Sequence, residues 1–447
     1  MKRITIIGGG ASGTLTATNL LKLAGETPLH VDLVEKRSRI GRGVAFGTTR
    51  DAHLLNVPCG RMGAFPDDVG GFHAWLVANG HEFDDHAFVP RRLFGAYLRD
   101  TFESAAASTN VSIELHDDEA VDLSVDNKAA QVMLRSGEIL QTDKVVLAFG
   151  NFAPPDPSVV NKDFVTSPRY FKDPWNDELY SSLKPDDEVF VIGTGLSMVD
   201  VAIQLNASGH RGKISAISTK GLLPAVHELG HTYPVFNDEL DGATRITDVF
   251  KTVRKHAAKA EQDSNWRAVI DSLRPATQKL WLDLPLAEKR YFKQHLSRYW
   301  NIARHRVPPE ANAILQQMQA DGRLEILAGR LNDIRHDGRF SITYSNNGIE
   351  STAKADVLVN CIGSETNFSR IDSEFVRNLV ARRHIRNNEL DMGIMATPDG
   401  RVFSKNDEYS ETVWTLGTAL KGTLWETTAI PEIRTQARAL ALRLLAE

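Results

Sequence analysis

Cysteine is scarce in this chain. The 447 residues include only two, Cys59 and Cys361, and these do not form a C-x-x-C pair. A dithiol redox centre of the reductase type is therefore not encoded locally. A pairing of the two distant thiols stays open, although two reduced thiols in a cytosolic protein are the simpler interpretation.

Long runs of basic or apolar residues are also missing. The formal net charge is −5, and short basic clusters such as residues 382–386 are typical of solvated faces, so the sequence indicates no nucleic-acid partner. No apolar stretch approaches the length of a membrane span, and residues 4–7 are too few for the apolar core of a signal peptide. We therefore expect a cytoplasmic protein with no membrane partner. Its length predicts two or three domains.

The N-terminus holds the most informative pattern. Residues 3–7 read as a buried strand, residues 8–13 spell Gly-Gly-Gly-Ala-Ser-Gly, and residues 14–24 read as a helix. This order is typical of a dinucleotide site, in which Gly8 makes the tight turn, Gly10 lets a pyrophosphate approach the backbone and Gly13 lets helix and strand pack closely. The helix N-terminus offers free N–H groups to the phosphates.

An acid completes this first pattern. A second apolar run over residues 31–34 ends at Glu35. At this place in the motif a carboxylate accepts hydrogen bonds from the hydroxyls of an unphosphorylated ribose. The alternative is a glycine-rich turn with no ligand. It does not explain why a strand, a glycine turn, a helix, a second strand and an acid follow in this order.

A second nucleotide pattern occurs in the middle of the chain. Residues 188–192 read as a strand, and Gly193-Thr-Gly195-Leu196-Ser197 leads into a helix. Met198 replaces the third glycine, so we expect helix and strand to lie slightly further apart. The next strand, residues 214–218, ends without an acid, and Lys220 follows. A lysine there can pair with a 2′-phosphate, which favours NADPH over NADH, although a solvated lysine is an equal alternative.

Three more apolar strands end in glycine, at Gly150, Gly363 and Gly417. Such ends mark places where the chain turns sharply or passes close to another group. The order of these strands predicts two nested Rossmann-like domains in an α/β protein: residues 1–186 and 364–447 form the first, and residues 187–363 are inserted as the second. A terminal helix through residue 446 is expected after Trp425, with Thr427 or Thr428 as its cap and Pro431 in its first turn.

Residues 225–310 have a different character. Three stretches, 250–256, 266–273 and 286–302, have helical spacing, and the segment is longer than a βαβ crossover requires. Such a helical insertion can roof a substrate pocket or form an oligomer face, and the sequence does not decide between them or fix the oligomeric state.

Two dinucleotide sites in one chain indicate a relay. One nucleotide then passes hydride to the other, and the natural pair is NAD(P)H with FAD. Because its acid suits an unphosphorylated ribose, the first site fits the ADP half of FAD. The second site then holds NADPH or NADH.

The sequence resembles the bacterial FAD-NAD(P)-binding proteins of the two-dinucleotide-binding-domain flavoprotein superfamily, which includes N-hydroxylating and Baeyer–Villiger monooxygenases. The resemblance covers most of the chain and is carried by residues 7–13, 41–47, 54–58, 193–200, 299–306 and 425–434. The Leu-Leu-Asn-Val-Pro segment at 54–58 and the Trp-Glu-Thr-Thr segment at 425–428 are its more particular parts. The Baeyer–Villiger signature, a phenylalanine-led motif with His and Trp-Pro, is not present.

The resemblance implies a set of cofactor contacts. Gly8, Gly10, Ser12 and Gly13 lie at the FAD pyrophosphate and Glu35 at its ribose, while Arg42 and Asn56 lie near the pyrophosphate or flavin. Val121 borders the adenine, and Gly417 approaches the ribityl chain. The helix after Trp425 points its N-terminus at the flavin. Thr418 stands where many relatives carry aspartate, which leaves the ribityl hydrogen bonding undefined.

From this we expect an FAD-dependent NAD(P)H oxidoreductase. The leading hypothesis is a monooxygenase that transfers one oxygen atom from O2 to a small organic substrate through a flavin C4a-(hydro)peroxide. No catalytic side chain is identified, because the flavin supplies the chemistry. One alternative is a flavin reductase or dehydrogenase with another acceptor. The other is a non-enzymatic FAD- and NAD(P)-binding sensor or scaffold.

Three further features carry weaker signals. His227 and His231 fit H-E-x-x-H by letters, but prolines on both sides and Gly230 argue against the helix that a zinc site needs, so no metal is expected. Residues 304–306, Arg-His-Arg, suit a substrate carboxylate or a phosphate, or simply a cationic helix end. Asp200, in the second nucleotide helix, is expected to be a local cap or a buried hydrogen-bond partner.

Overall fold

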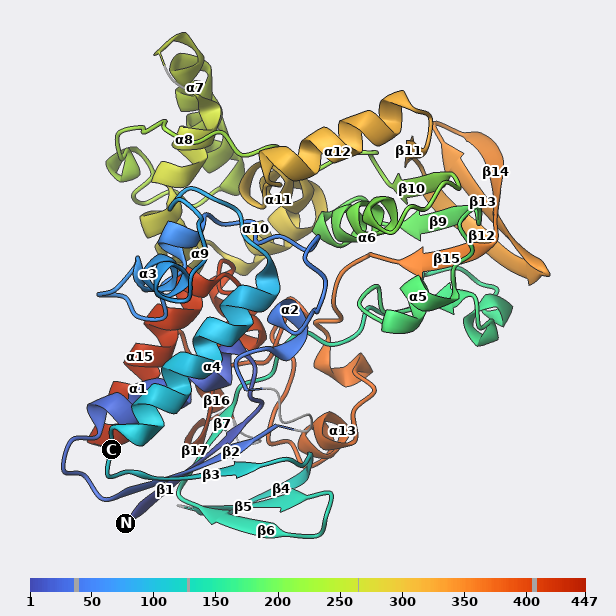
Figure 1. The fold of residues 1–447 in the computed structure, drawn as a ribbon. Helices are drawn as coiled ribbons and strands as arrows, with labels where there is room; N and C mark the ends of the chain where they lie inside the picture. The colour runs from blue at the N-terminus through green and yellow to red at the C-terminus, as the bar shows by residue number, and fades with distance from the viewer. Residues whose placement is uncertain (36–39, 127–128, 264, 404–407) are drawn as a thin grey trace.

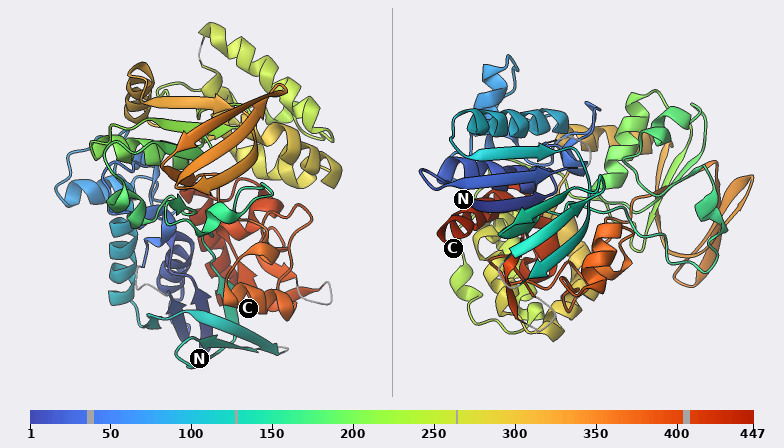
Figure 2. Two further views of the ribbon diagram at one scale, coloured as in Figure 1. Left: turned by 90° about the vertical axis from the view of Figure 1, so that its right-hand side faces the viewer. Right: turned by 90° about the horizontal axis from the view of Figure 1, so that it is seen from below.

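The computed structural model describes residues 1–35, 40–126, 129–263, 265–403 and 408–447. Two parallel sheets lie in different parts of the molecule, and a body of helices packs beside them (Figures 1 and 2). The predicted α/β class with two Rossmann-like folds is confirmed. Across the described residues, no helix combines the length and the hydrophobicity needed to cross a membrane.

The first sheet has six strands in the order β16-β17-β7-β1-β2-β3. Its strands are β1 (Lys2–Ile7), β2 (Leu29–Val34), β3 (Ser112–His116), β7 (Lys144–Leu147), β16 (Arg401–Phe403) and β17 (Tyr409–Thr415). All neighbours are parallel except the edge pair of β16 and β17. The C-terminal strands thus join a sheet begun at the N-terminus, as the nested order predicts.

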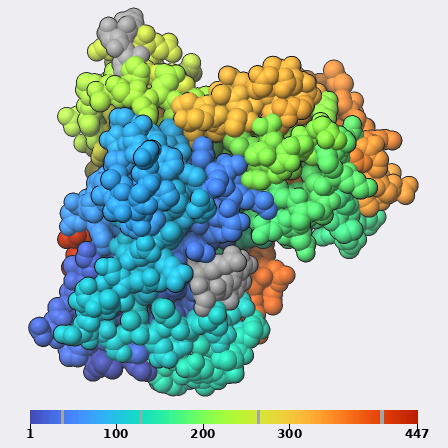
Figure 3. All heavy atoms as spheres, in the orientation of Figure 1, coloured from blue at the N-terminus to red at the C-terminus, as the bar shows by residue number. Residues whose placement is uncertain are grey.

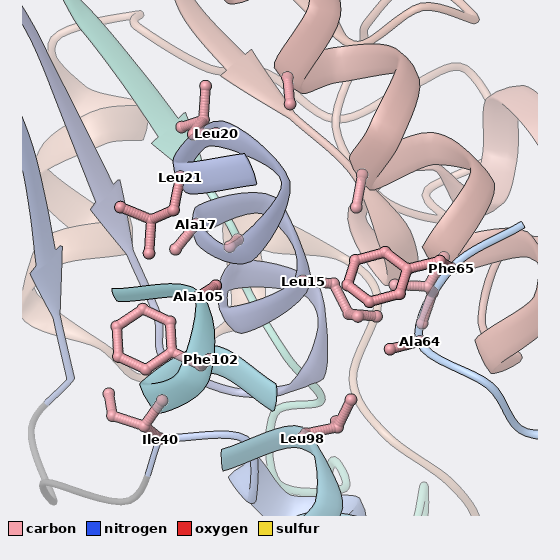
Figure 4. Close-up of a cluster of buried hydrophobic side chains, with 14 of the residues drawn as sticks. Leu15, Ala17, Leu20, Leu21, Ile40, Ala64, Phe65, Leu98, Phe102 and Ala105 are labelled. Carbon is pink, nitrogen blue, oxygen red and sulfur yellow. The ribbon is translucent and has the colours of Figure 1, made fainter. Parts of the chain in front are cut away.

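Helices cover one face of this sheet. They are α1 (Ala11–Leu23), α4 (Arg91–Ala107) and α15 (Ile430–Ala446). Alternation along β1 directs Ile4 and Ile6 into the core beneath these helices. In this core Leu15 of α1 lies towards Phe65, and Phe102 of α4 lies on the other side of α1 (Figure 4). The two chain ends lie close together here, and Lys2 Nζ donates to the Leu444 carbonyl at 2.9 Å.

A three-stranded antiparallel sheet covers the opposite face. It consists of β4 (Ala120–Asp126), β5 (Ala129–Leu134) and β6 (Ile139–Thr142), with α13 (Glu374–Ala381) beside it. Ile7 and Val34 face this layer rather than the helices. Both faces of the parallel sheet are therefore buried, which explains the near-continuous apolar runs of its strands.

The second sheet repeats this plan. Its five strands run in the order β11-β10-β9-β15-β8, and every pair is parallel. They are β8 (Tyr170–Phe171), β9 (Val189–Ile192), β10 (Ile214–Ser218), β11 (Leu324–Ala328) and β15 (Val357–Asn360). On one face lie α6 (Leu196–Ala207) and α12 (Pro309–Ala320), and on the other lies the antiparallel sheet of β12 (Arg330–Asp337), β13 (Arg339–Asn346) and β14 (Ile349–Ala355).

The domain limits stay a prediction. The boundary expected at residue 186 lies after β8, which hydrogen-bonds to β15 in the second sheet. The backbone passes between the two folds near Ala153 and again near Glu365. These two places are neighbours, since the Glu365 amide donates to the Ala153 carbonyl at 3.4 Å.

The predicted helical segment is present. Its helices are α7 (Ile246–Asp263), α8 (Trp266–Ser272), α9 (Arg274–Asp283), α10 (Leu286–Tyr291) and α11 (Ser297–Arg304), with a π-helical turn over Phe292–Leu296 between the last two. They share one hydrophobic core that also takes in Trp425 from the C-terminal part of the chain. We call this segment the helical body; it lies at the upper left of Figure 1 and forms one corner of the surface in Figure 3.

The remaining short elements connect these parts. They are α2 (Gly43–Phe46), η1 (Cys59–Arg61), α3 (Gly71–Ala78), η2 (Asp163–Thr166), α5 (Asp177–Ser182), η3 (Asn237–Glu239), η5 (Phe368–Arg370), η6 (Gly417–Leu420) and α14 (Lys421–Leu424).

One predicted cap is wrong. The terminal helix α15 begins at Ile430 with Pro431 in its first turn, as expected, but its N-cap is Ala429 and no side chain caps it. The Thr427 hydroxyl instead donates to the Gly417 carbonyl at 3.1 Å. The Thr427 hydroxyl therefore bonds a residue that is distant in the sequence, instead of capping the helix in the way that the local pattern predicted.

Candidate functional site

The first glycine turn admits only glycine at two of its positions. Gly8 has φ +106°, and a Cβ there would lie 2.5 Å from the carbonyl oxygen of Ala148, just after β7. A Cβ on Gly13 would lie 1.8 Å from the Gly8 carbonyl oxygen. The tight turn and the close packing of helix on strand predicted for Gly8 and Gly13 are therefore both present.

The start of α1 is an open set of donors. Gly10 is the N-cap of the helix and has no side chain to occupy the first amides. Within the described residues, no group accepts a hydrogen bond from the amides of Ala11, Ser12 or Gly13. Three free N–H groups at the positive end of a helix form a ready anion site.

Glu35 lies beside this turn. Its Oε2 accepts a hydrogen bond from the Gly9 amide at 2.8 Å, which fixes the carboxylate at the edge of the glycine turn. A cavity of about 230 Å³ adjoins it, lined among others by Ile40, Phe102 and His116. A carboxylate beside a partly apolar cavity suits an adenosine. The carboxylate accepts hydrogen bonds from the ribose hydroxyls, and the cavity buries the adenine ring.

The loop after β2 closes over the same turn. The Gly41 amide donates to the Gly9 carbonyl and to the Thr14 hydroxyl, both at 2.9 Å. This holds Arg42 next to the turn, and its guanidinium has no hydrogen-bond or ion-pair partner in the part of the chain that the structure describes. A free cation beside free amides strengthens the case for an anionic ligand.

Gly417 reaches the first turn from the far end of the chain. It has φ +70°, and a Cβ there would lie 2.7 Å from the Ser12 hydroxyl. Its amide donates to Gln436 Oε1 at 2.9 Å, and its carbonyl accepts from Thr427. Gly417 thus lies against Ser12 of the first turn, while its approach to the ribityl chain, which the resemblance implied, stays a prediction.

The second glycine turn has the same plan but fewer close contacts. Gly193 has φ +110°, and a Cβ there would lie 2.3 Å from the carbonyl oxygen of Cys361, just after β15. Gly195 is the N-cap of α6, and its missing side chain would meet open space. In the described chain, the amides of Leu196, Ser197 and Met198 have no acceptor.

Three other predicted site residues lie outside the two glycine turns. Lys220 follows β10 and is exposed, where a second nucleotide could reach it. Val121 lies in β4, and its carbonyl accepts from Asn378 Nδ2 at 2.8 Å, but it is not part of the lining of the cavity beside Glu35. Gly150 is exposed and its missing side chain would meet no protein atom, so its predicted place beside a cofactor stays a prediction.

A buried ion pair joins the two nucleotide folds. Arg91, at the start of α4, contacts Asp200 in α6 through both guanidinium nitrogens, at 2.9 and 3.1 Å, and its Nε donates to the Leu54 carbonyl at 2.8 Å. Burial raises the pKa of Asp200 to about 6 against the opposing charge of Arg91. Asp200 is thus a buried partner across the interface and not a local cap.

The same interface includes His227 and Asn56. His227 Nε2 donates to the Asn56 carbonyl at 2.9 Å, which ties the loop after β10 to the loop near the first turn. Burial lowers the pKa of His227 to about 4, so the ring is neutral at pH 7. The Asn56 side-chain amide has no partner among the described residues. The carboxyl ends of both sheets therefore meet in one region.

The H-E-x-x-H letters have another use. Residues 227–231 are not helical, and Glu228 pairs with Arg267 at 3.0 Å. With one imidazole nitrogen bonded to a carbonyl and the acid paired elsewhere, the segment lacks the two-histidine helix face of a zinc site.

A charged cluster lies between the helical body and α15. Trp300 Nε1 donates to Glu426 Oε1 at 2.7 Å, and Arg304 and His305 lie within 3.8 Å of the other carboxylate oxygen. Burial alone would raise the pKa of Glu426, but His305, Arg304 and Trp300 hold it at about 2. Glu426 is therefore a compensated anion.

Of the roles predicted for the 304–306 segment, Arg306 fits the cationic helix end and not a ligand contact, because its Nε donates to the Ala303 carbonyl in the last turn of α11 at 2.8 Å. Its side chain is 2 % exposed and bonds Asp271 through both terminal nitrogens, at 2.9 and 3.0 Å. It ties α8 to the end of α11 and is not available to a ligand. Neither the Arg91 nor the Arg306 pair was predicted; the signal for the first was a carboxylate within the apolar run of residues 196–205.

Comparisons with known proteins agree with this architecture. Residues 5–152 match the family model described as FAD-NAD(P)-binding. A search of curated protein sequences finds no match. Among solved structures, L-lysine 6-monooxygenase from Pseudomonas syringae superposes with a TM-score of 0.67 at 14 % identity, over 99 % of this chain and 98 % of its own.

Two further structures extend the comparison. Ornithine N-hydroxylase KtzI from Kutzneria sp. 744 has a TM-score of 0.65 at 14 % identity, over 99 % of this chain and 98 % of its own. The bacillithiol disulfide reductase from Staphylococcus aureus has a TM-score of 0.59 at 14 % identity, over 100 % and 99 %. At such identity these likenesses establish the fold alone. The chain therefore has the fold of these solved structures, and its residues 5–152 match the FAD-NAD(P)-binding family model.

Proposed function

We propose that this protein is an FAD-dependent NAD(P)H oxidoreductase, and specifically a monooxygenase that acts on a small organic substrate with O2. When bound, FAD supplies the chemistry: it accepts hydride from NAD(P)H and activates oxygen. The protein's own residues bind both coenzymes, orient them and limit the access of water.

One observation carries the proposal. Two glycine turns each lie at the carboxyl end of a parallel strand, and each opens a helix with three free amides. The two folds that hold them are joined by the Arg91–Asp200 ion pair between helices and by the His227–Asn56 hydrogen bond between loops. Two dinucleotides bound at such turns would approach each other at the carboxyl ends of the two sheets. That arrangement suits hydride transfer from one coenzyme to the other.

Roles follow for the residues of the first fold. The amides of the Gly8–Gly13 turn and the free guanidinium of Arg42 would hold the pyrophosphate of FAD, and the carboxylate of Glu35 would hold its ribose. Asn56 and Gly417 would lie along the rest of the cofactor, and α15 would present the positive end of its dipole, where it stabilises an anionic reduced ring.

In the second fold, the amides of Leu196 and Ser197 would hold the pyrophosphate of NADPH. Gly195 leaves room for the phosphates because its missing side chain would point into open space, and Gly193 allows the tight turn against the Cys361 carbonyl. Lys220 would pair with the 2′-phosphate, and no acid stands there to repel it.

The cysteines favour oxygen chemistry over disulfide reduction. Burial raises the pKa of Cys59 to about 11, and its thiol donates to the Asp84 carbonyl at 3.0 Å. Burial likewise raises the pKa of Cys361. Because a thiolate is the nucleophile in thiol–disulfide exchange, two buried protonated thiols are poor candidates for it.

Absorbance and oxygen consumption test the proposal together. We expect the purified protein to carry or take up FAD, NADPH to bleach the flavin without oxygen, and a suitable substrate to increase oxygen consumption. Hydroxylated product formed in proportion to NADPH consumed would support a monooxygenase. NADPH oxidation coupled to an electron acceptor and never to product would instead identify a flavin reductase, and protein that refuses FAD would contradict the proposal.

A further inference from the structure

A cavity lies within the helical body. It measures about 500 Å³, which is in the range of small-molecule sites, and α7 to α11 form most of its wall. Aromatic and aliphatic side chains line it, including Phe250, Trp281, Phe292 and Trp300. The helical body is therefore not packed solid: it encloses a space suited to an apolar molecule.

This cavity adjoins the proposed flavin site through one residue. Trp425 forms part of its wall and packs on Trp281 and Phe292, with ring centroids 5.1 and 4.7 Å apart. Glu426 and Thr427 follow directly, and Thr427 donates to Gly417, which touches the first glycine turn. A molecule in the cavity would thus lie next to the segment that leads to the flavin.

Trp425 carries two signs of a ligand contact. Its backbone has φ +59°, a conformation that side-chain-bearing residues rarely adopt and that clusters at functional sites. Its side chain is 7 % exposed, yet the indole N–H is buried with no hydrogen-bond partner in the described chain. Folded proteins leave few buried donors without an acceptor, so this feature also sets Trp425 apart.

The polar groups of the cavity select the charge of that ligand. Among the described residues, no acidic residue lines it. Glu426, which follows Trp425 in the chain, is already compensated by Trp300, Arg304 and His305. Glu288 lies close by and accepts a hydrogen bond from the backbone amide of the lining residue Ile246 at 2.9 Å. Arg254 on α7 does line the cavity; it is exposed to solvent, and its guanidinium has no hydrogen-bond or ion-pair partner among the described residues. An ammonium group would meet an uncompensated cation here, whereas a carboxylate would find a partner.

We propose that the substrate is an apolar carboxylic acid whose hydrocarbon or aromatic body fills this cavity and whose carboxylate pairs with Arg254. This rests on the proposed function for the reaction, but the binding site stands on its own residues. It also separates this protein from the lysine and ornithine enzymes that share its fold, whose named substrates carry a side-chain ammonium group.

Binding to the flavin-loaded protein tests the proposal. The probes are 4-phenylbutyrate, its neutral counterpart 4-phenylbutanol and L-lysine, followed by calorimetry and by quenching of tryptophan fluorescence, since Trp281, Trp300 and Trp425 line the cavity. We expect 4-phenylbutyrate to bind, 4-phenylbutanol to bind about tenfold more weakly because it lacks the ion pair, and L-lysine not to bind.

Variants assign the contacts. Arg254→Gln should weaken binding of 4-phenylbutyrate about tenfold and leave 4-phenylbutanol unchanged, whereas Trp425→Phe should weaken both probes. Lys259→Gln, an exposed cation on the same helix outside the cavity lining, is the matched control and should change neither.

The outcomes separate the two proposals. Binding of L-lysine in preference to 4-phenylbutyrate, equal affinities for 4-phenylbutyrate and 4-phenylbutanol, or no probe binding by a protein whose FAD is reduced by NADPH would overturn this inference and leave the proposed function standing. Probe binding by a protein that never accepts FAD would overturn the proposed function and leave the acid-binding cavity.

Discussion

A Cβ on Gly13, at the third glycine position of the first turn, would lie 1.8 Å from a carbonyl oxygen, whereas the second turn carries the whole side chain of Met198 there, fully buried. The first turn also has Glu35 bonded to its backbone and Gly417 pressed against Ser12. The second has open space at Gly195 and an exposed lysine.

This contrast in tightness suits two different coenzymes. A turn enclosed by three segments of the chain favours a coenzyme that stays bound through many turnovers. A turn with open surroundings favours one that enters and leaves in each cycle. Within the proposed function, these are FAD and NADPH respectively.

The largest expected effect comes from adding a side chain at the first glycine of each turn, Gly8 or Gly193. Gly8→Ala places a Cβ 2.5 Å from the Ala148 carbonyl oxygen and should lower bound FAD at least about tenfold. Gly193→Ala places one 2.3 Å from the Cys361 carbonyl oxygen and should keep FAD but slow its reduction by NADPH at least about tenfold. Flavin absorbance and anaerobic reduction rates measure the two effects.

The matched control is Gly137→Ala. Gly137 has φ +94° but no neighbour within reach of a Cβ, so it isolates backbone strain from collision. It should change neither cofactor. Loss of both cofactor functions in both glycine variants would mean that the two turns do not serve separate ligands.

The interface between the folds should respond to loss of Arg91. Arg91→Ala leaves Asp200 buried without its cation, which costs about 3–5 kcal/mol for a buried pair broken on one side. Arg50→Ala removes a pair in which Asp177 is 82 % exposed and should cost at most about 1 kcal/mol. Urea unfolding measures both. Equal losses would contradict the assignment of Arg91 as the buried link.

Acid should weaken the same interface through His227. Its folded pKa is about 4 and its ordinary value is 6.5, so the unfolded chain binds more protons between these values and stability falls as the pH drops from 6.5 towards 4. The full effect is up to about 3 kcal/mol.

Asp200 acts in the opposite direction, because its raised pKa of about 6 makes stability fall as pH rises through 4 to 6. The difference between the wild type and His227→Gln, in which the amide can still donate to Asn56, isolates the histidine. Urea unfolding at both ends of this pH range measures it, and parallel pH curves for the two proteins would refute the assignment.

The smallest effect concerns Lys220. Lys220→Ala should raise the KM for NADPH about tenfold and leave that for NADH unchanged, because only the former has a 2′-phosphate to pair with. Steady-state kinetics with both coenzymes measure this. An equal change for both would mean that Lys220 does not read the phosphate.

Local patterns carried most of the prediction. The glycine turns, their strands and the start of their helices follow from residues that are neighbours in the sequence, so Gly8, Gly13 and Gly193 could be placed in advance. The nested order of the sheets also followed, because the strands of residues 144–147 and 357–360, and the end of the strand of residues 409–415, are largely apolar and lie shortly before a glycine.

Contacts between distant residues were out of reach. Nothing near Asp200 in the sequence names Arg91 as its partner, and nothing near Arg306 names Asp271. The Thr427 cap failed for the same reason, since its hydroxyl serves Gly417. The cavity in the helical body depends on how its helices and Trp425 pack together, which their periodicities do not encode.

The most direct test of the central claim is anaerobic mixing of the FAD-loaded protein with NADPH, in the wild type and in Gly193→Ala. The account predicts rapid bleaching of the flavin in the wild type and retained but slowly bleached flavin in the variant. Equally fast bleaching in both proteins would contradict a separate NADPH site at the second glycine turn.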